Sequence, residues 1–222
     1  MIELIDVSRK FGEETVLKSV SHRFDGGKIH GIVGNNGSGK TVMMKCICGF
    51  LRPSTGKILV RGKQVGRDMD FPENLGVIIE TPGFLGNLTG KKNLQILASL
   101  NRKVMDGEIE AVLRRVGLDP GLKKSVQKYS LGMRQRLGIA QAIMEDPDLL
   151  ILDEPFNGLD KRGAKEIRAL LKELKQKGKT ILLASHNGQD IDELCDTVCE
   201  MDAGVLQVIR TEHVEEGRDD TQ

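Results

Sequence analysis

The sequence predicts an α/β fold with a mainly parallel sheet, an N-terminal antiparallel β region and an inserted helical lobe. Two short apolar runs, LLIL at 149–152 and ILLA at 181–184, are typical of strands buried on both faces of a parallel sheet. A helical apolar stripe lies between them, so strand, helix and strand follow in the order of a parallel crossover. Helical spacing throughout residues 89–145 indicates the lobe.

The N-terminal residues predict the antiparallel β region. Residues 2–7 and 15–24 favour strands, and the Gly26–Gly27 pair favours a turn before a third strand at 28–34. That strand continues into a glycine-rich loop, which a helix should follow directly. The helix has an apolar stripe at Met44, Ile47, Cys48 and Leu51.

The middle of the chain alternates between strand and helix signals. Pro53 to Gly56 end the first helix, and strand character resumes at 57–62. Three groups of apolar residues define the lobe: Leu94, Leu97 and Leu100; Ile109, Val112, Leu113 and Val116; and Leu137, Ala140 and Met144. The helix between the two buried strands has its apolar face at Ala164, Ile167, Leu170, Leu171 and Leu174. We expect one domain over 1–210 and a polar tail over 211–222.

Composition limits the functions to consider. Lysine and arginine number 33 against 32 aspartate and glutamate, so no net charge attracts nucleic acid, and we expect no nucleic-acid partner. No apolar run approaches the roughly 18 residues of a membrane span. The first eleven residues lack the roughly seven consecutive apolar residues of a signal peptide. We therefore expect a cytoplasmic protein that meets a membrane only through a partner.

The four cysteines, at 46, 48, 195 and 199, lack the CxxC spacing of zinc and redox sites. We expect them to be structural thiols in a reducing compartment.

A phosphate-binding motif lies between the third strand and the first helix. GNNGSGKT at 34–41 satisfies GxxxxGK[ST] in the strand-to-helix context that the motif requires. Its glycines let backbone N–H groups face a phosphate, and the helix N-terminus adds its dipole. A chance glycine turn is the alternative. The expected nucleotide-binding residues are Gly34, Asn35, Asn36, Gly37, Ser38, Gly39, Lys40 and Thr41, with Lys40 on the β- and γ-phosphates and Thr41 on Mg²⁺.

Two adjacent carboxylates end the apolar strand at 149–152. Asp153 is suited to hold a Mg²⁺ shell, and Glu154 is suited to take the proton of an attacking water. General-base catalysis of this kind contributes about 10²- to 10⁴-fold. The alternative is a plain strand end with solvated acids.

Over residues 1–210 the chain resembles an ATP-binding cassette, the nucleotide-binding subunit of ABC transporters. The motifs that carry the resemblance occur in the family's order: Walker A GNNGSGKT at 34–41, signature YSLGMRQRL at 129–137, Walker B LLILDEP at 149–155, D-loop NGLD at 157–160, and SH at 185–186. The resemblance implies the ABC form of the P-loop NTPase fold, with ATP and Mg²⁺ as cofactors. It also implies a head-to-tail dimer with a second copy or a homologous cassette, with two ATP molecules held between the two.

The resemblance assigns roles to further residues. Ser130 and Gly132 would contact the γ-phosphate of ATP bound to the facing chain, and Ser130 would also serve as an N-cap. His186 matches the switch histidine, which hydrogen-bonds the γ-phosphate and links it to the catalytic Glu154. Phe11 matches the aromatic that stacks on adenine, although a core role is the alternative.

Asp160 resembles the D-loop aspartate that meets its counterpart across the dimer. Capping of a helix that begins near Lys161 explains it equally well.

Three residues depart from the family's pattern. Leu131 replaces the first signature glycine and Met133 replaces the glutamine, so closure over ATP is expected to be weaker. Glu80 stands where the Q-loop normally has glutamine; it can ligate Mg²⁺ or orient water, but it brings negative charge near the phosphates. Glu80, the following PGFLGNLTGKKNL and the SLGMRQRL signature resemble the ATPases of bacitracin-resistance and lantibiotic-immunity exporters.

The predicted function is therefore an ATPase that powers a membrane exporter, peripheral on the inner face of the membrane through a transmembrane permease. The permease contact is expected near residues 80–88, where Phe84 and Leu85 are apolar residues in a loop; burial under the helical lobe is the alternative. A chromosome- or ribosome-associated ABC ATPase is a second reading, which the short interval between the motifs at 40 and 130 disfavours. A nucleotide-gated switch is a third, which Glu154 and His186 disfavour.

Overall fold

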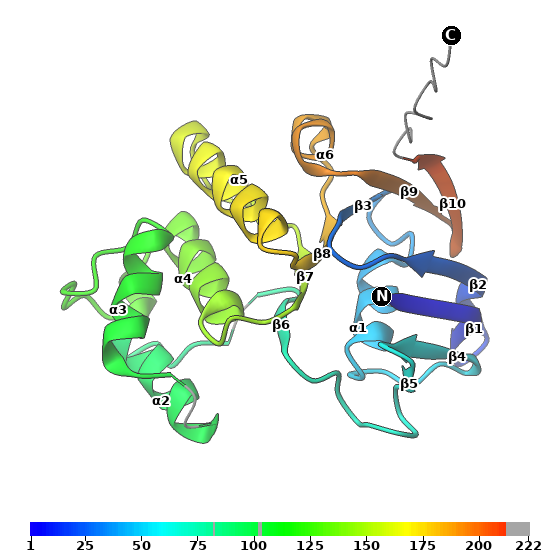
Figure 1. Ribbon diagram of the computed structural model, residues 1–222, viewed down its shortest axis with the longest axis horizontal. Helices are drawn as coiled ribbons and strands as arrows, with labels where there is room; N and C mark the ends of the chain where they lie inside the picture. The colour runs from blue at the N-terminus through cyan, green and yellow to red at the C-terminus, as the bar shows by residue number, and fades with distance from the viewer. Residues whose placement is uncertain (82, 102–103, 212–222) are drawn as a thin grey trace, which may run out of the picture.

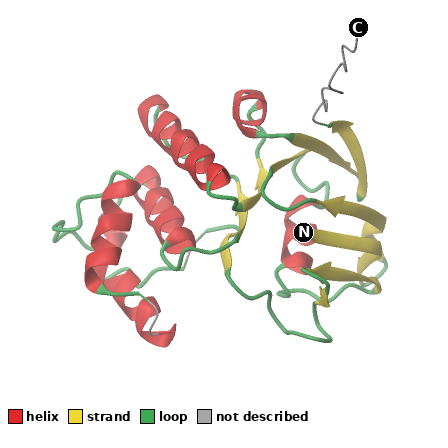
Figure 2. Cartoon of the chain, viewed as in Figure 1, coloured by secondary structure: helices red, strands yellow, loops and turns green. Residues whose placement is uncertain are grey.

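The computed structural model describes residues 1–81, 83–101 and 104–211. The predicted tail at 211–222 lies outside the described residues, apart from Thr211. The N-terminal strands lie at one end of the molecule and the helical lobe at the other, with further strands between them (Figure 1). Figure 2 shows the same separation by type of secondary structure. Within the described part, no helix has the length and apolar character needed to cross a membrane.

The strands form two sheets. The antiparallel sheet has the order β2-β1-β4-β5 and contains β1 (Ile2–Phe11), β2 (Glu14–Phe24), β4 (Thr55–Val60) and β5 (Lys63–Gln64). The larger sheet has the order β10-β9-β3-β8-β7-β6. Its strands are β3 (Ile29–Val33), β6 (Leu75–Ile78), β7 (Leu149–Asp153), β8 (Thr180–Ala184), β9 (Thr197–Asp202) and β10 (Val205–Arg210). All pairs in the larger sheet are parallel except β9 with β10, which confirms the predicted fold class.

The helices follow the predicted order. They are α1 (Lys40–Ile47), α2 (Gly90–Asn101), α3 (Asp106–Arg115), α4 (Leu131–Ile143), α5 (Lys161–Gln176) and α6 (Gly188–Leu194). The lobe consists of α2, α3 and α4 (Figure 1). Leu51 lies beyond the end of α1 but still packs on the core, and Gly163 is buried on α5 where Ala164 was expected.

The central strands separate two apolar clusters. Leu150 and Leu152 of β7 belong to the cluster that includes the lobe and α5, whereas Ile151 belongs to the cluster of α1 and the antiparallel sheet. Ile181 and Leu182 of β8 divide in the same way. Because successive side chains of a strand point to opposite faces, this alternation means that the sheet is covered on both sides, as the continuous apolar runs predicted.

The register brings the ends of three strands to one edge of the sheet. Asp153 at the end of β7 pairs with Ala184 at the end of β8, and Ile32 of β3 pairs with Ala184 from the other side. The segments that follow β3, β7 and β8 therefore emerge side by side. In parallel α/β sheets this edge is the usual place for a ligand site.

Strand β6 is an element that the sequence pattern did not predict. Its Gly76 weakens the strand signal, but a Cβ there would lie 2.0 Å from the carbonyl oxygen of Ala142. Glycine is required because the backbone of α4 passes directly over the strand. The short elements α6, β9 and β10 were likewise not predicted.

Candidate active site

The phosphate loop joins β3 to α1. Gly34 has a φ of 142° and Gly39 a φ of 113°, values that side chains rarely adopt. A Cβ on Gly34 would lie 2.1 Å from the carbonyl oxygen of Met201, so glycine is needed there for close approach as well. The loop is thereby held in one conformation against β9.

Lys40 and Ser38 place a buried cation and a buried hydroxyl in the phosphate loop. The Lys40 ammonium is buried and donates to the carbonyl oxygens of Gly34 (2.6 Å) and Asn35 (2.9 Å). Neutral carbonyls compensate a buried cation poorly. The Ser38 hydroxyl is buried and has no hydrogen-bond partner in the described part of the chain. A buried cation and an orphaned hydroxyl beside a helix N-terminus fit the phosphates of a nucleotide.

Thr41 and Asp153 form the next part of the site. Thr41 Oγ1 donates to Asp153 Oδ2 at 2.6 Å, and both residues line a cavity of about 300 Å³ together with the phosphate loop and Glu154. A hydroxyl and a carboxylate are the hard oxygen ligands that Mg²⁺ prefers, with the remaining positions filled by water and phosphate. The described residues contain no cluster of three or more His, Cys, Asp or Glu side chains that would form an all-protein metal cage.

Glu154 and His186 are in direct contact. Nδ1 of His186 lies 2.8 Å from Oε2 of Glu154. Glu154 has a φ of 51°, and its backbone N–H donates to the carbonyl oxygen of Ala184 at 3.0 Å. A positive φ outside glycine is strained and is frequent at functional sites. The strain turns the acid out of the strand direction while the sheet holds its backbone.

Glu80 is placed near the site but is paired elsewhere. It follows β6, and its Oε1 accepts a hydrogen bond from Lys45 Nζ at 2.6 Å. Lys45 lies on α1, one helical turn beyond Thr41. Glu80, Asp153 and Glu154 together line a second cavity of about 460 Å³. The negative charge expected from Glu80 is therefore present, but Lys45 compensates it.

Ser130 and Gly132 lie at the start of α4, next to the D-loop. Ser130 Oγ accepts from the Met133 N–H at 3.2 Å, which is the N-cap geometry. A Cβ on Gly132 would lie 2.6 Å from the carbonyl oxygen of Gly158. Leu131 packs toward Gly158 but keeps 55% of its surface exposed. The signature and the D-loop thus form one continuous surface.

Asp160 and Phe11 each contact residues close to them in the sequence. Asp160 caps α5 by accepting from the Gly163 N–H at 2.8 Å. Phe11 at the end of β1 is 44% exposed, and the Arg9 guanidinium lies 4.5 Å from its ring centroid. It is exposed rather than part of the core, and it does not line the cavity at the phosphate loop.

Gln135 is a contact residue that sequence reasoning missed. Its side chain is buried on α4, and Nε2 donates to the Glu154 carbonyl oxygen at 3.3 Å. It links the signature helix to the backbone of Glu154. A polar residue on the buried face of a predicted helix is the signal that would have found it.

The cysteines agree with the structural reading. Burial raises the pKa of Cys46 to about 11 and that of Cys48 to about 12. All four cysteines are free thiols, and the two on β9 and before it, Cys199 and Cys195, also have raised pKa values because of burial.

A phosphate loop, a hydroxyl–carboxylate pair and a Glu–His pair around the same edge of a parallel sheet define a nucleoside-triphosphatase site of the P-loop class. Residues 17–157 match the family model described as ABC transporter, and the chain belongs to that family. Its place there is that of the ATP-binding subunit, an ATPase homologous to bacitracin and lantibiotic transport ATPases.

Relatives cover almost the whole chain. The uncharacterized ABC transporter ATP-binding protein YybJ of Bacillus subtilis is 41% identical, over 93% of this chain and 95% of its own length. The bacitracin transport ATP-binding protein BcrA of Enterococcus faecalis is 43% identical, over 93% of this chain and 68% of its own length. The lantibiotic transport ATP-binding protein SrtF of Streptococcus pyogenes is 35% identical, over 89% of this chain and 85% of its own length.

Solved structures share the fold. The dimeric structure of MJ0796, a bacterial ABC transporter cassette, has a TM-score of 0.84 at 23% identity, covering 95% of this chain and 99% of that chain. An ATP-binding subunit of an ABC transporter has a TM-score of 0.83 at 29% identity, covering 94% and 90%.

Proposed function

We propose that this protein binds and hydrolyses Mg²⁺-ATP to power a membrane exporter of peptide antibiotics, and thereby contributes to resistance. The observation that carries the hydrolytic part is the Glu154–His186 contact beside the Thr41–Asp153 pair. The substrate class is supported by the similarity to BcrA and SrtF, whose names refer to bacitracin and lantibiotic transport.

The chain's own groups divide the chemistry. Lys40 would exchange its two loop carbonyls for the β- and γ-phosphates, and Thr41 and Asp153 would hold Mg²⁺, which would supply positive charge against the phosphates. Glu154 takes the proton of the attacking water. His186 orients Glu154 through Nδ1 and offers Nε2 to the γ-phosphate.

Glu80 lines the second cavity together with Asp153 and Glu154, while its Oε1 accepts from Lys45. In that position it would ligate Mg²⁺ or orient water.

A second cassette completes the site in this proposal. Ser130 and Gly132 at the start of α4 would contact the γ-phosphate bound by the facing chain, while Asp160 would meet its counterpart. The exposed Leu131 and the contact between Gly132 and Gly158 support a common surface for this dimer. Phe11 would stack on adenine, since an exposed ring with a guanidinium on one face suits a base on the other.

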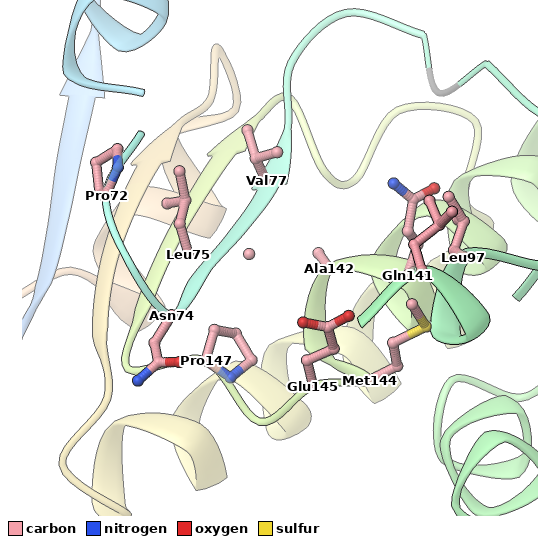
Figure 3. Close-up of a pocket in the computed structure, with 12 residues that line it drawn as sticks. Pro72, Asn74, Leu75, Val77, Leu97, Gln141, Ala142, Met144, Glu145 and Pro147 are labelled. Carbon is pink, nitrogen blue, oxygen red and sulfur yellow. The ribbon is translucent and has the colours of Figure 1, made fainter. Parts of the chain in front are cut away.

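A groove beside β6 suits the permease. It has a volume of about 350 Å³ and lies between β6, α2 and the end of α4. Leu75 and Val77 face Leu97 and Met144 across it (Figure 3). Phe84 packs against the helical lobe, whereas Leu85 is exposed, so the loop at 80–88 would contribute Leu85 to the contact. We propose that an apolar cytoplasmic segment of the permease docks here, which places the subunit on the inner face of the membrane.

The proposal is tested by light scattering of the Glu154→Gln variant with and without Mg²⁺-ATP. Blocking proton abstraction should trap a nucleotide-dependent dimer of twice the monomer mass, while wild type turns ATP over. A nucleotide-bound monomer at all concentrations would contradict the ATP-closed dimer. For the substrate, deletion of the gene should sensitise the host to bacitracin or to a lantibiotic, and only the wild type should restore growth. Equal growth of both strains would contradict the assigned substrate class.

A further inference from the structure

A buried ion pair joins α5 to α6 close to the active site. Asp190 on α6 is only 1% exposed, and the Arg168 side chain on α5 is 11% exposed. Nε and Nη2 of Arg168 each lie 2.7 Å from Oδ1 of Asp190. Two charges are removed from water here, and removing Arg168 would leave the buried Asp190 carboxylate without its countercharge.

The second oxygen of the same carboxylate holds the segment that carries His186. The Ser185 hydroxyl donates to Asp190 Oδ2 at 3.2 Å and accepts from the Asn187 N–H at 3.1 Å. Ser185 is buried, whereas the His186 side chain is 68% exposed. The residues on both sides of His186 are therefore tied to Asp190, while its ring projects toward Glu154.

Arg168 also reaches the segment that follows Glu154. Its guanidinium lies 5.8 Å from the ring centroid of Phe156, two positions beyond Glu154 and directly before the D-loop. One buried cation thus contacts the chain after the catalytic acid and, through Asp190, the chain around the histidine.

We propose that Arg168 and Asp190 are positioning residues for ATP hydrolysis. Their ion pair, extended through Ser185, holds the backbone of residues 185–187 so that His186 stays within hydrogen-bond distance of Glu154. This inference rests on the proposed roles of Glu154 and His186. It adds residues from α5 and α6 that contact neither nucleotide nor metal in that mechanism.

Ser185→Ala and Asp190→Asn test the proposal, with Glu193→Gln as the matched control. Glu193 faces the same Arg168 at 3.6 Å but is partly exposed and does not contact Ser185 in the described structure. We expect Asp190→Asn to lower kcat at least tenfold and Ser185→Ala at least threefold, with KM for ATP within twofold. The control should keep the wild-type kcat. The ¹H–¹⁵N signals of the His186 ring should shift in both test variants and stay in place in the control.

The outcomes separate positioning from stability. A lowered melting temperature with unchanged kcat and unchanged His186 signals would overturn the proposal. Should Asp190→Asn fail to fold, Ser185→Ala decides, because it cuts the link and leaves the ion pair intact. Full turnover by His186→Ala would instead remove His186 from the proposed mechanism. In that event the His186 signals of the Ser185→Ala and Asp190→Asn variants still report whether Asp190 positions the ring.

Discussion

Thr41 and Asp153 are 112 positions apart in the sequence, and their side chains share a hydrogen bond of 2.6 Å. Thr41 lies in the first turn of α1 and Asp153 ends β7, so the contact exists because β7 and the strand that precedes α1 end at one edge of the sheet. The same edge brings His186 to Glu154. The proposed hydrolysis depends on both contacts.

Replacement of His186 should separate ATP binding from hydrolysis. His186→Ala removes the partner of Glu154 but leaves Lys40 and the phosphate loop untouched. We expect the dissociation constant of a fluorescent ATP analogue to stay within about threefold, while kcat falls at least 100-fold, the magnitude of lost general-base assistance. Unchanged turnover would remove His186 from the mechanism.

The Lys45–Glu80 pair should show coupling in a double-mutant cycle. Both side chains are partly exposed, so their attraction contributes well under 1 kcal/mol to the stability of the fold. Their effect should be on activity, because Lys45 compensates a charge beside the cavity. Glu80→Gln should keep ATPase activity within about tenfold, Lys45→Met should lower it, and the double variant should recover toward Glu80→Gln.

The measurement for this cycle is kcat as a function of Mg²⁺ concentration. Additive effects of the two substitutions would show that the pair is incidental. Complete loss of activity in Glu80→Gln would show that the acid itself is required.

Gly132→Ala should lower stability at the contact between the signature and the D-loop. The added Cβ would lie 2.6 Å from the Gly158 carbonyl oxygen, so backbone must move. We expect the free energy of unfolding in urea to fall by about 1–3 kcal/mol, as in other overpacked sites.

Gly107→Ala is the matched control for that substitution. Gly107 is also helical, and a Cβ there meets nothing within 4 Å. The control should gain up to about 1 kcal/mol from helix propensity. An equal gain in the free energy of unfolding for Gly132→Ala and Gly107→Ala would contradict the close contact between Gly132 and Gly158.

Stability should decrease on mild acidification because of a buried histidine. Burial holds the pKa of His30 below its ordinary value of 6.5, and this effect outweighs the hydrogen bond to the Asp25 carbonyl oxygen, which acts to raise the pKa. The unfolded chain therefore binds more protons than the folded chain as the pH falls through and below 6.5, and stability is lost in that direction. The pKa of His22 is also lowered, first by burial and then by His30.

Urea unfolding between pH 7 and pH 5 checks this prediction. Wild type should lose stability over the interval, and His30→Gln should lose less, because one of the two groups no longer titrates. A wild-type free energy of unfolding that is constant or rises toward pH 5 would contradict it.

The sequence by itself determined the elements whose signal is local. GNNGSGKT is contiguous, so its glycines, Lys40 and Thr41 could be assigned from spacing alone, and the runs before Asp153 and Ser185 marked buried strands because both faces are apolar. The cap at Asp160 was also predictable, since an N-cap bonds within its own first turn.

Only the tertiary structure decided the contacts between distant segments. These contacts join residues whose separation in the sequence follows no helical or strand periodicity. They are Lys45 with Glu80, Gly132 with Gly158, and Arg168 with Asp190. Strand β6 could not be predicted because glycine has a low strand propensity. Gly76 is needed there because the backbone of α4 lies too close for a side chain. Local sequence patterns indicate which face of a segment is buried. Which residues of another segment that face contacts depends on sheet register and helix packing.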